Sequence, residues 1–344
     1  MSARECVIPV FVPHLGCTND CVFCNQRRIS GSTAPATAQD VEIAIDNAAA
    51  LLPKGAKRQL AFYGGSFTAI PVDQQEALLS AAKRRMDMGD IDALRLSTRP
   101  DAIDGEVLKR LKRYGVETIE LGAQSMCDEV LELSGRGHTA TDVENASRLI
   151  KAAGFRLILQ MMTGLPGDSA ARTVETAQRI IALRPDGVRI YPTVIVRDTA
   201  LYDLWQMGRY KEHTVDEAVE YCAQIVPLFE AAGIPIIRLG LNPTEELSDG
   251  AAAGGAYHPA LGELVKSRIM LDKARLLFKN TGIAQNSIVT LGVDSTLISQ
   301  MTGQHRGNIR ALCAEFALSG VKVRALPIKK GNIEILSVES REKI

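Results

Sequence analysis

The sequence lacks an excess of charge of either sign and lacks any long apolar run. Its 344 residues hold 40 Lys and Arg against 40 Asp and Glu. No overall field therefore attracts nucleic acid, and only a local basic patch could do so. The apolar run nearest the start, residues 7–12, contains Pro9, is followed by Pro13, and is too short for a signal segment or a membrane span. We expect a cytoplasmic protein with no membrane partner.

Apolar residues are plentiful enough for a packed core. Hydrophobic residues make up 46% of the chain and charged residues 23%, and the mean hydropathy is +0.02. This composition excludes disordered and fibrous classes. The length suits a β/α barrel with an additional piece, because such barrels often exceed the size of an average domain.

Short apolar runs of strand length alternate with helical patterns. Strands are predicted over residues 6–12, 59–63, 93–97, 116–121, 155–162 and 187–193. Helices are predicted between them over residues 73–86, 105–114, 142–153 and 170–183. This alternation requires parallel strands with crossover helices, either as a barrel or as an open doubly wound sheet. We predict six such units.

Local signals set the ends of some helices. Thr141 with Glu144 predicts a capping box for the third of these helices, and Thr214 with Glu217 predicts another for a helix over 214–232. Pro185 ends the helix that precedes the sixth strand.

The alternation changes after residue 213. The expected order is the helix over 214–232, a strand over 236–239, a Gly/Ala-rich loop over 250–256, a helix over 266–278, and strands over 322–325 and 332–338. We predict a core over 1–213, an extension over 214–282 that closes the barrel, and a small α/β piece over 283–344.

The seven cysteines divide into two groups. An odd number in a reducing compartment does not suit a disulfide framework. Four cysteines stand apart and are predicted to be ordinary small buried residues: Cys6, Cys127, Cys222 and Cys313. The other three, Cys17, Cys21 and Cys24, lie in the loop after the first strand, on the side where β/α barrels build active sites.

Two metal centres suit three neighbouring thiolates. A structural zinc ion takes four ligands, and His14 could complete a Cys3His set. A 4Fe-4S cluster normally takes four thiolates, so three would leave one iron without a cysteine and able to bind another ligand.

The C-x3-C-x2-C spacing, with Phe23 just before the last cysteine, resembles the signature of radical S-adenosylmethionine (SAM) enzymes. The resemblance implies that Cys17, Cys21 and Cys24 hold a 4Fe-4S cluster whose open iron binds the amino and carboxylate groups of SAM, with Phe23 near the adenine. One electron from a low-potential donor of the flavodoxin or ferredoxin type would then cleave SAM to a 5'-deoxyadenosyl radical that abstracts hydrogen.

Further positions match cofactor motifs of that superfamily. Gly64, Gly65 and Ser66 stand where a glycine-rich motif contacts the SAM amino group. In the branch of the oxygen-independent coproporphyrinogen oxidases, a glutamine and an arginine placed like Gln124 and Arg136 are associated with the cofactor's ribose and carboxylate, a role that amide and guanidinium chemistry suits. Gln160 is either a further ribose contact or a structural amide.

Several phrases resemble one family more closely, the radical domain of the Elongator catalytic subunit, which modifies the wobble uridine of tRNA. These are VPHLGC at 12–17, STRPD at 97–101, ELGAQS at 120–125, RGHT at 136–139, RIYPT at 189–193 and YHP at 257–259. The resemblance implies tRNA as a partner. That family also carries an acetyltransferase domain, which we expect to be absent here, since no CoA-binding loop is recognisable after Gly282.

The substrate is expected at the barrel mouth, near Tyr257 and His258. His258 could act as an acid or base, or could be a structural hydrogen bonder. Basic runs at 83–85, 109–113 and 329–330 leave RNA binding open, with solvated surface faces as the alternative. A radical SAM enzyme for porphyrinogen decarboxylation or sulfur insertion, and a non-catalytic iron–sulfur or zinc protein, are the competing interpretations.

Overall fold

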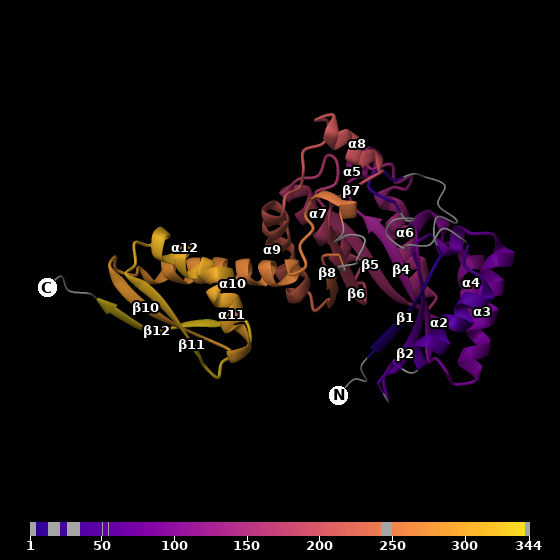
Figure 1. Cartoon of the computed structure of the whole chain (residues 1–344), viewed down its shortest axis with the longest axis horizontal. Coiled ribbons are helices and arrows are strands. Elements are labelled where there is room, and N and C mark those ends of the chain that lie inside the picture. The colour runs from indigo at the N-terminus through magenta and orange to yellow at the C-terminus, as the bar shows by residue number, and fades with distance from the viewer. Residues whose placement is uncertain are drawn as a thin grey trace. The chain divides into compact units, whose positions relative to one another are not determined.

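The computed structural model describes residues 5–12, 21–25, 35–49, 51–53, 55–241 and 250–340. Contacts divide the chain into two compact units, one of Met1–Thr214 with Leu228–Tyr257 and one of Val215–Pro227 with His258–Ile344. Figure 1 shows the helices and strands of both units. Within the described ranges, no helix has both the length and the apolar character needed to cross a membrane.

The first unit is built on a seven-stranded sheet in the order β1-β2-β3-β4-β5-β6-β8, in which every neighbouring pair is parallel. The strands are β1 (Glu5–Phe11), β2 (Lys57–Tyr63), β3 (Ala93–Thr98), β4 (Val116–Gln124), β5 (Arg156–Thr163), β6 (Gly187–Pro192) and β8 (Ile236–Leu239). They curl into a half-barrel, so the predicted α/β partial barrel is confirmed. The predicted strand over 236–239 joins this sheet as its seventh strand.

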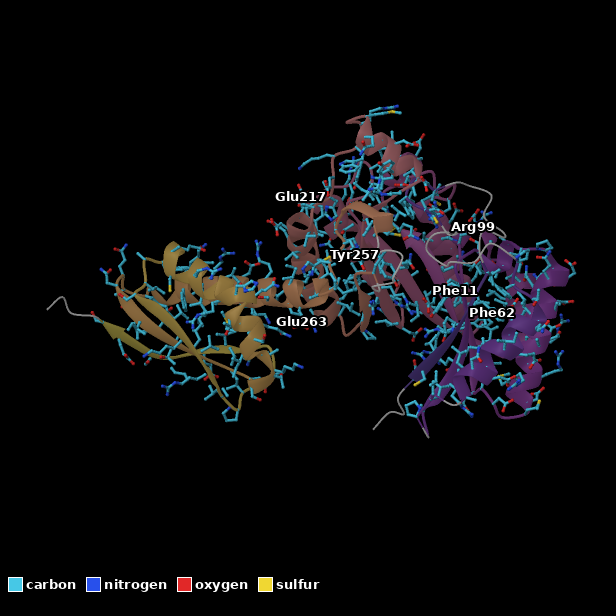
Figure 2. The ribbon with its side chains drawn as sticks, viewed as in Figure 1. Phe11, Phe62, Arg99, Glu217, Tyr257 and Glu263 are labelled. Atoms are coloured by element: carbon cyan, nitrogen blue, oxygen red, sulfur yellow. The ribbon has the colours of Figure 1, made fainter. Side chains whose placement is uncertain are left out.

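Helices follow the strands in the alternating order that the sequence indicates. They are α2 (Ala38–Ala49), α3 (Val72–Asp87), α4 (Gly105–Arg113), α5 (Asp128–Leu133), α6 (Ala140–Ala152) and α7 (Ala170–Ala182). They cover one face of the sheet, whose apolar side chains, such as Phe62 and Leu121, are at most 1% exposed. Phe11, on the neighbouring strand but on the opposite face, is 40% exposed (Figure 2).

The other face of the sheet is polar at its centre. Successive side chains of a strand point to opposite faces, and register places Arg95 next to Thr118 and Gln160 next to Arg189. Glu120 lies on the same face as Thr118, two residues along β4. A half-barrel encloses this face, which is where its functional groups are concentrated.

The capping box predicted from Thr141 and Glu144 is wrong by two residues. Helix α6 begins after Thr139, whose side chain accepts from the Asp142 backbone N–H while the Asp142 carboxylate accepts from the Thr139 backbone N–H. Aspartate therefore takes the place expected for glutamate, because its shorter side chain still reaches the first N–H of the turn.

The Gly/Ala-rich segment expected as a loop instead contains strand β9 (Ala252–Gly255), which pairs antiparallel with β7 (Val194–Val196). At Gly255, φ is +83° and a Cβ would lie 2.7 Å from the Thr193 carbonyl oxygen. The glycines of β9 allow its backbone to approach that of β7 closely. Because this strand has few apolar side chains, its period could not be recognised in the sequence. Helices α8 (Ala200–Gln206) and α9 (Val215–Ala231) lie between these strands in sequence.

The second unit packs helices on one face of a three-stranded sheet of order β11-β10-β12. Its elements are α10 (Leu261–Thr281), β10 (Ser287–Val293), α11 (Ile298–Thr302), α12 (Gly307–Glu315), β11 (Gly320–Ala325) and β12 (Ile333–Ser340). Strand β11 is parallel to β10, and β12 is antiparallel to it. The predicted helix over 266–278 falls within α10 and the predicted strand over 322–325 within β11, while the strand predicted over 332–338 begins one residue before β12. Strand β10 and the two short helices were not predicted.

The isolated cysteines are less buried than expected. Only Cys222 is fully buried, and the expectation is wrong for Cys6, Cys127 and Cys313, which are half-buried. Cys6 lies on β1, Cys127 precedes α5 as its N-cap, and Cys313 lies on α12.

Candidate active site

The cysteine loop follows β1, and the structure describes part of it. Cys17 and His14 lie outside the described residues. Cys21 and Cys24 are described and half-buried, and the Cys24 backbone N–H donates to the Cys21 carbonyl at 2.9 Å. This turn carries two of the three predicted ligands on one short stretch of backbone.

Backbone hydrogen bonds fix the turn to two helices. Val22 donates to the Ser134 carbonyl at the end of α5 (3.1 Å) and accepts from the Leu201 N–H in α8 (2.7 Å). Phe23 packs against an apolar cluster that includes Ile195 and Tyr210. The turn is therefore held by elements that follow β4 and β6, far from it in sequence.

Arg136 connects this turn to the end of β4. Its Nη1 atom lies 3.1 Å from the Cys21 sulfur, and Nη2 donates to the Gly122 carbonyl at 2.8 Å. A guanidinium next to sulfur offsets the negative charge that a thiolate brings to a metal centre. The structure thus brings a predicted SAM-binding residue next to a predicted cluster ligand.

Gln124 and Gln160 form a pair at the carboxyl ends of β4 and β5. Gln160 Nε2 donates to Gln124 Oε1 at 3.2 Å. Gln124 has a φ of +65° at a register irregularity in β4, and a Cβ at Gly122 would lie 2.9 Å from the Gln124 amide nitrogen. Gly122 therefore leaves space for Gln124 and accepts from Arg136, which joins three of the predicted residues into one cluster.

Gly64, Gly65 and Ser66 follow β2 directly at the same carboxyl edge of the sheet. Gly64 has a φ of +99°, which L side chains rarely adopt, and Ser66 is 6% exposed. Val12, at the end of β1, donates to the Tyr63 carbonyl at 2.7 Å. The glycine turn and the cysteine loop therefore begin at adjacent strand ends.

A buried charge network on the polar face of the sheet was not predicted. The Glu120 carboxylate, 4% exposed as a side chain, pairs with Arg95 at 3.0 Å and with Arg189 at 2.8 Å. Tyr63 donates to it at 2.9 Å, and burial, followed by the charge of Glu120, raises the pKa of Tyr63. The signal in the sequence was a charged residue within an apolar stretch of each strand: Arg95 on β3, Glu120 on β4 and Arg189 on β6.

His138, within the RGHT phrase at 136–139, was not predicted as a site residue, yet it is buried near Arg136. It is 4% exposed, and its Nε2 lies 3.2 Å from the Ala123 carbonyl. Burial, followed by the charge of Arg136, lowers the pKa of His138 to about 4. His138 is therefore neutral at physiological pH and donates through Nε2.

Tyr257 and His258 fall on either side of the division between the units. Tyr257 packs against the cluster of Val194, Val196 and Ala251 in the first unit. His258 Nδ1 accepts from the Ala260 N–H at 3.1 Å, at the start of α10. Their role in catalysis stays a prediction.

Two family models match this chain. A model described as the Radical SAM superfamily matches residues 11–180, and one described as the Radical_SAM C-terminal domain matches residues 185–270. Human Elongator complex protein 3 is 36% identical over 177 residues, which is 51% of this chain and 31% of that protein. The tRNA uridine(34) acetyltransferase of Methanocaldococcus jannaschii is 30% identical over 197 residues, 50% of this chain and 36% of that protein.

Solved structures show the same fold. An N-terminally truncated archaeal Elp3 from Methanocaldococcus infernus aligns with a TM-score of 0.61 at 21% identity, over 83% of this chain and 65% of that one. Streptococcus suis SuiB bound to S-adenosylmethionine aligns with a TM-score of 0.51 at 13% identity, over 72% and 52%. The chain thus spans about a third of the length of the curated relatives that it matches.

Proposed function

The chain belongs to the radical SAM superfamily, and on that premise we propose that it cleaves SAM reductively at a 4Fe-4S cluster to abstract hydrogen from tRNA. The single observation that carries this proposal is the position of Arg136, which donates hydrogen bonds to both the Cys21 sulfur and the Gly122 carbonyl. It joins the cysteine turn to the strand end where Gln124 and Gln160 meet.

The residues present fit an iron–sulfur cluster better than a zinc ion. Thiolate sulfur suits both, but a structural zinc site would require a fourth ligand. His14, the fourth ligand considered for zinc, lies outside the described residues, so the choice of an iron–sulfur cluster rests on the family model that matches residues 11–180. Cys21 and Cys24, with Cys17, would hold the cluster. When bound, the cluster would supply the electron that breaks SAM into methionine and the 5'-deoxyadenosyl radical.

The protein's own groups would bind and orient SAM. Arg136 pairs with its carboxylate, while Gly64 and Gly65 let backbone groups approach its amino group. The Gln124–Gln160 pair leaves the Gln124 amide nitrogen and the Gln160 oxygen for ribose hydroxyls. Phe23 offers an apolar ring to the adenine.

Proton transfer to or from the substrate is assigned to His258, with Tyr257 beside it. Because His258 Nδ1 accepts a backbone N–H, the proton of its neutral ring is on Nε2. Nε2 is then the atom that would donate. An external donor of the flavodoxin or ferredoxin type would supply the electron.

The choice of tRNA as substrate rests on relatives that overlap half of this chain. One of them bears the name tRNA uridine(34) acetyltransferase. Identity of 30–36% over about half of this chain supports a shared substrate class.

The decisive experiment is anaerobic reconstitution with iron and sulfide, followed by dithionite and SAM. We expect 5'-deoxyadenosine from the wild type and from Cys313→Ala, a half-buried cysteine of the second unit. Cys21→Ala should abolish both the product and the visible absorption of the cluster. A well-folded, cluster-loaded wild type that forms no 5'-deoxyadenosine would reject the chemistry, and unchanged yield from Cys21→Ala would reject the ligand assignment.

A further inference from the structure

The charges of this neutral chain are unevenly distributed. From His258 to the end, 13 Lys and Arg stand against 7 Asp and Glu. The rest of the second unit, Val215–Pro227, adds three acids and no base, which gives 13 against 10 for the second unit and 27 against 30 for the first. Asymmetry of this kind is typical of proteins in which one part meets a polyanion. The second unit is therefore the place to look for a binding surface.

Most cations in the basic runs of the barrel pair with neighbouring acids. Lys83 pairs with Asp87, and Arg85 with Glu42 and Asp46. Arg113, on α4, pairs with Glu76. These runs are ion-paired surface helices, so they are poor candidates for a nucleic-acid surface.

Three acids of the second unit lie on helices α10 and α12 and pair with cations of α10. Lys266 pairs with Glu263, Arg268 with Asp272, and Arg275 with Asp272 and Glu315. Because these acids are taken up on the helical side, they are not available to the cations of the sheet.

Four exposed cations lie on β11 and the loop that follows it: Lys322, Arg324, Lys329 and Lys330, here called the β11 strip. Val321 and Val323 belong to the core under the helices, so Lys322 and Arg324 point to the face of the sheet that the unit's helices leave open. None of the four forms an ion pair with a residue that the structure describes. Their charge is available to a partner.

Three described acids of this unit lie near the strip: Asp294, Glu334, and Glu339, which is opposite Ile288 on the same face of the sheet as Lys322. Hydrogen bonds from Thr296 lower the pKa of Asp294, and the charge of Lys330 does so to a smaller extent. Glu334 and Arg324 flank Gly292 on the central strand, so they are two strand spacings, roughly 10 Å, apart. Against the four cations, these three acids leave the strip with a net positive charge.

Its composition indicates what kind of polyanion it fits. The aromatic residues of the second unit from His258 onward are Phe278 and Phe316, which pack edge to face in the core at 5.3 Å. Single-stranded RNA is held by bases stacked on exposed aromatic rings, whereas helical RNA is held through its phosphates and shape. We propose that the β11 strip docks the phosphate backbone of a helical RNA stem, so that the second unit positions the RNA substrate; this inference rests on the proposed function for the identity of that RNA.

Binding of the full-length chain to three labelled probes tests the strip: a tRNA transcript, an RNA duplex, and a single strand of the duplex's length without structure. The test variant is K322S/R324S/K329S/K330S, and the control is K83S/R84S/K109S/R113S, which removes equal charge from the ion-paired helices. At 0.15 M salt we expect the strip variant to bind tRNA and duplex at least ~10-fold more weakly. Its slope of log affinity against log salt should fall by about 3 to 4, since each phosphate contact contributes roughly 0.9. The control should stay within about 2-fold of the wild type.

Equal losses in both variants, an unchanged strip variant, or tighter binding to the single strand than to the duplex would overturn the proposal. So would binding of the wild type to phosphatidylserine vesicles with no affinity for RNA. Cleavage of SAM without RNA, measured in the strip variant, should equal that of the wild type. A wild type that binds duplex RNA through the strip but cleaves no SAM would refute the proposed function and leave this inference standing.

Discussion

Removing the Glu120 carboxylate should destabilise the barrel more than removing any exposed acid of the same strand. The carboxylate is 4% exposed and holds Arg95 at 3.0 Å and Arg189 at 2.8 Å. Glu120→Ala leaves two guanidinium groups, 5% and 16% exposed as side chains, without their shared acid. Breaking a buried pair in this way costs about 3–5 kcal/mol.

Glu117 provides the matched control. It lies on the same strand, and its carboxylate, 37% exposed, pairs with Lys57 at 2.7 Å. Exposed pairs contribute about 0–1 kcal/mol, so Glu117→Ala should have little effect on the free energy of unfolding. Both substitutions replace a glutamate by alanine, so the difference between their losses in free energy of unfolding reports the effect of burial.

Urea unfolding followed by tryptophan fluorescence measures the effect. The chain has one tryptophan, Trp205 on α8 of the first unit, so its fluorescence reports on the unit that contains Glu120. We expect the midpoint of Glu120→Ala to fall well below that of Glu117→Ala. If the two variants unfold within about 1 kcal/mol of each other, the network is not the buried charge cluster described above.

Three other perturbations have defined outcomes. Arg136→Lys should lower the 5'-deoxyadenosine yield at least ~10-fold while keeping cluster absorption, because lysine cannot pair bidentately with a carboxylate; an unaltered yield would remove Arg136 from SAM binding. The pKa of His138 is about 4 in the folded protein, below the ~6.5 of an unfolded histidine. The free energy of unfolding should therefore fall as pH drops from ~6.5 toward 4, by up to about 3 kcal/mol. His138→Asn should flatten that part of the stability–pH curve relative to the wild type, and parallel curves would contradict the assignment. Gly255→Ala places a Cβ 2.7 Å from the Thr193 oxygen, whereas Gly208→Ala, also at positive φ, meets open space; thermal unfolding should therefore show a loss at Gly255 larger by at least ~1 kcal/mol.

The order of strands and helices could be predicted because each element carries its own period. Leu60 and Phe62 stand two residues apart on β2, as residues of one strand face do, and Val107, Leu108 and Leu111 recur at helical spacing on α4. Capping residues were harder to place, since Thr139 and Thr141 both stand near the start of α6 and either could begin it. Only the hydrogen bonds of the folded turn distinguish them.

For the candidate site as well, the sequence identified residues, and the structure added the contacts between them. Local spacing was sufficient to select Cys17, Cys21 and Cys24, and short motifs were sufficient to select Gln124 and Arg136. The contacts of Arg136 with Cys21 and of Gln160 with Gln124 join residues 115 and 36 positions apart, and no sequence period encodes such pairings.

By itself, the amino-acid sequence determined the alternating α/β architecture, the cysteine cluster and the family resemblance, because these depend on residue type and on spacing along the chain. The tertiary structure decided which charges neutralise one another. Lys83 and Lys330 look alike in sequence, yet one lies beside Asp87 on a helix while the other follows an exposed edge strand without an ion pair in the described part of the chain. Charge pairing acts through space over a few ångströms, so only the fold shows which cations are left for a partner.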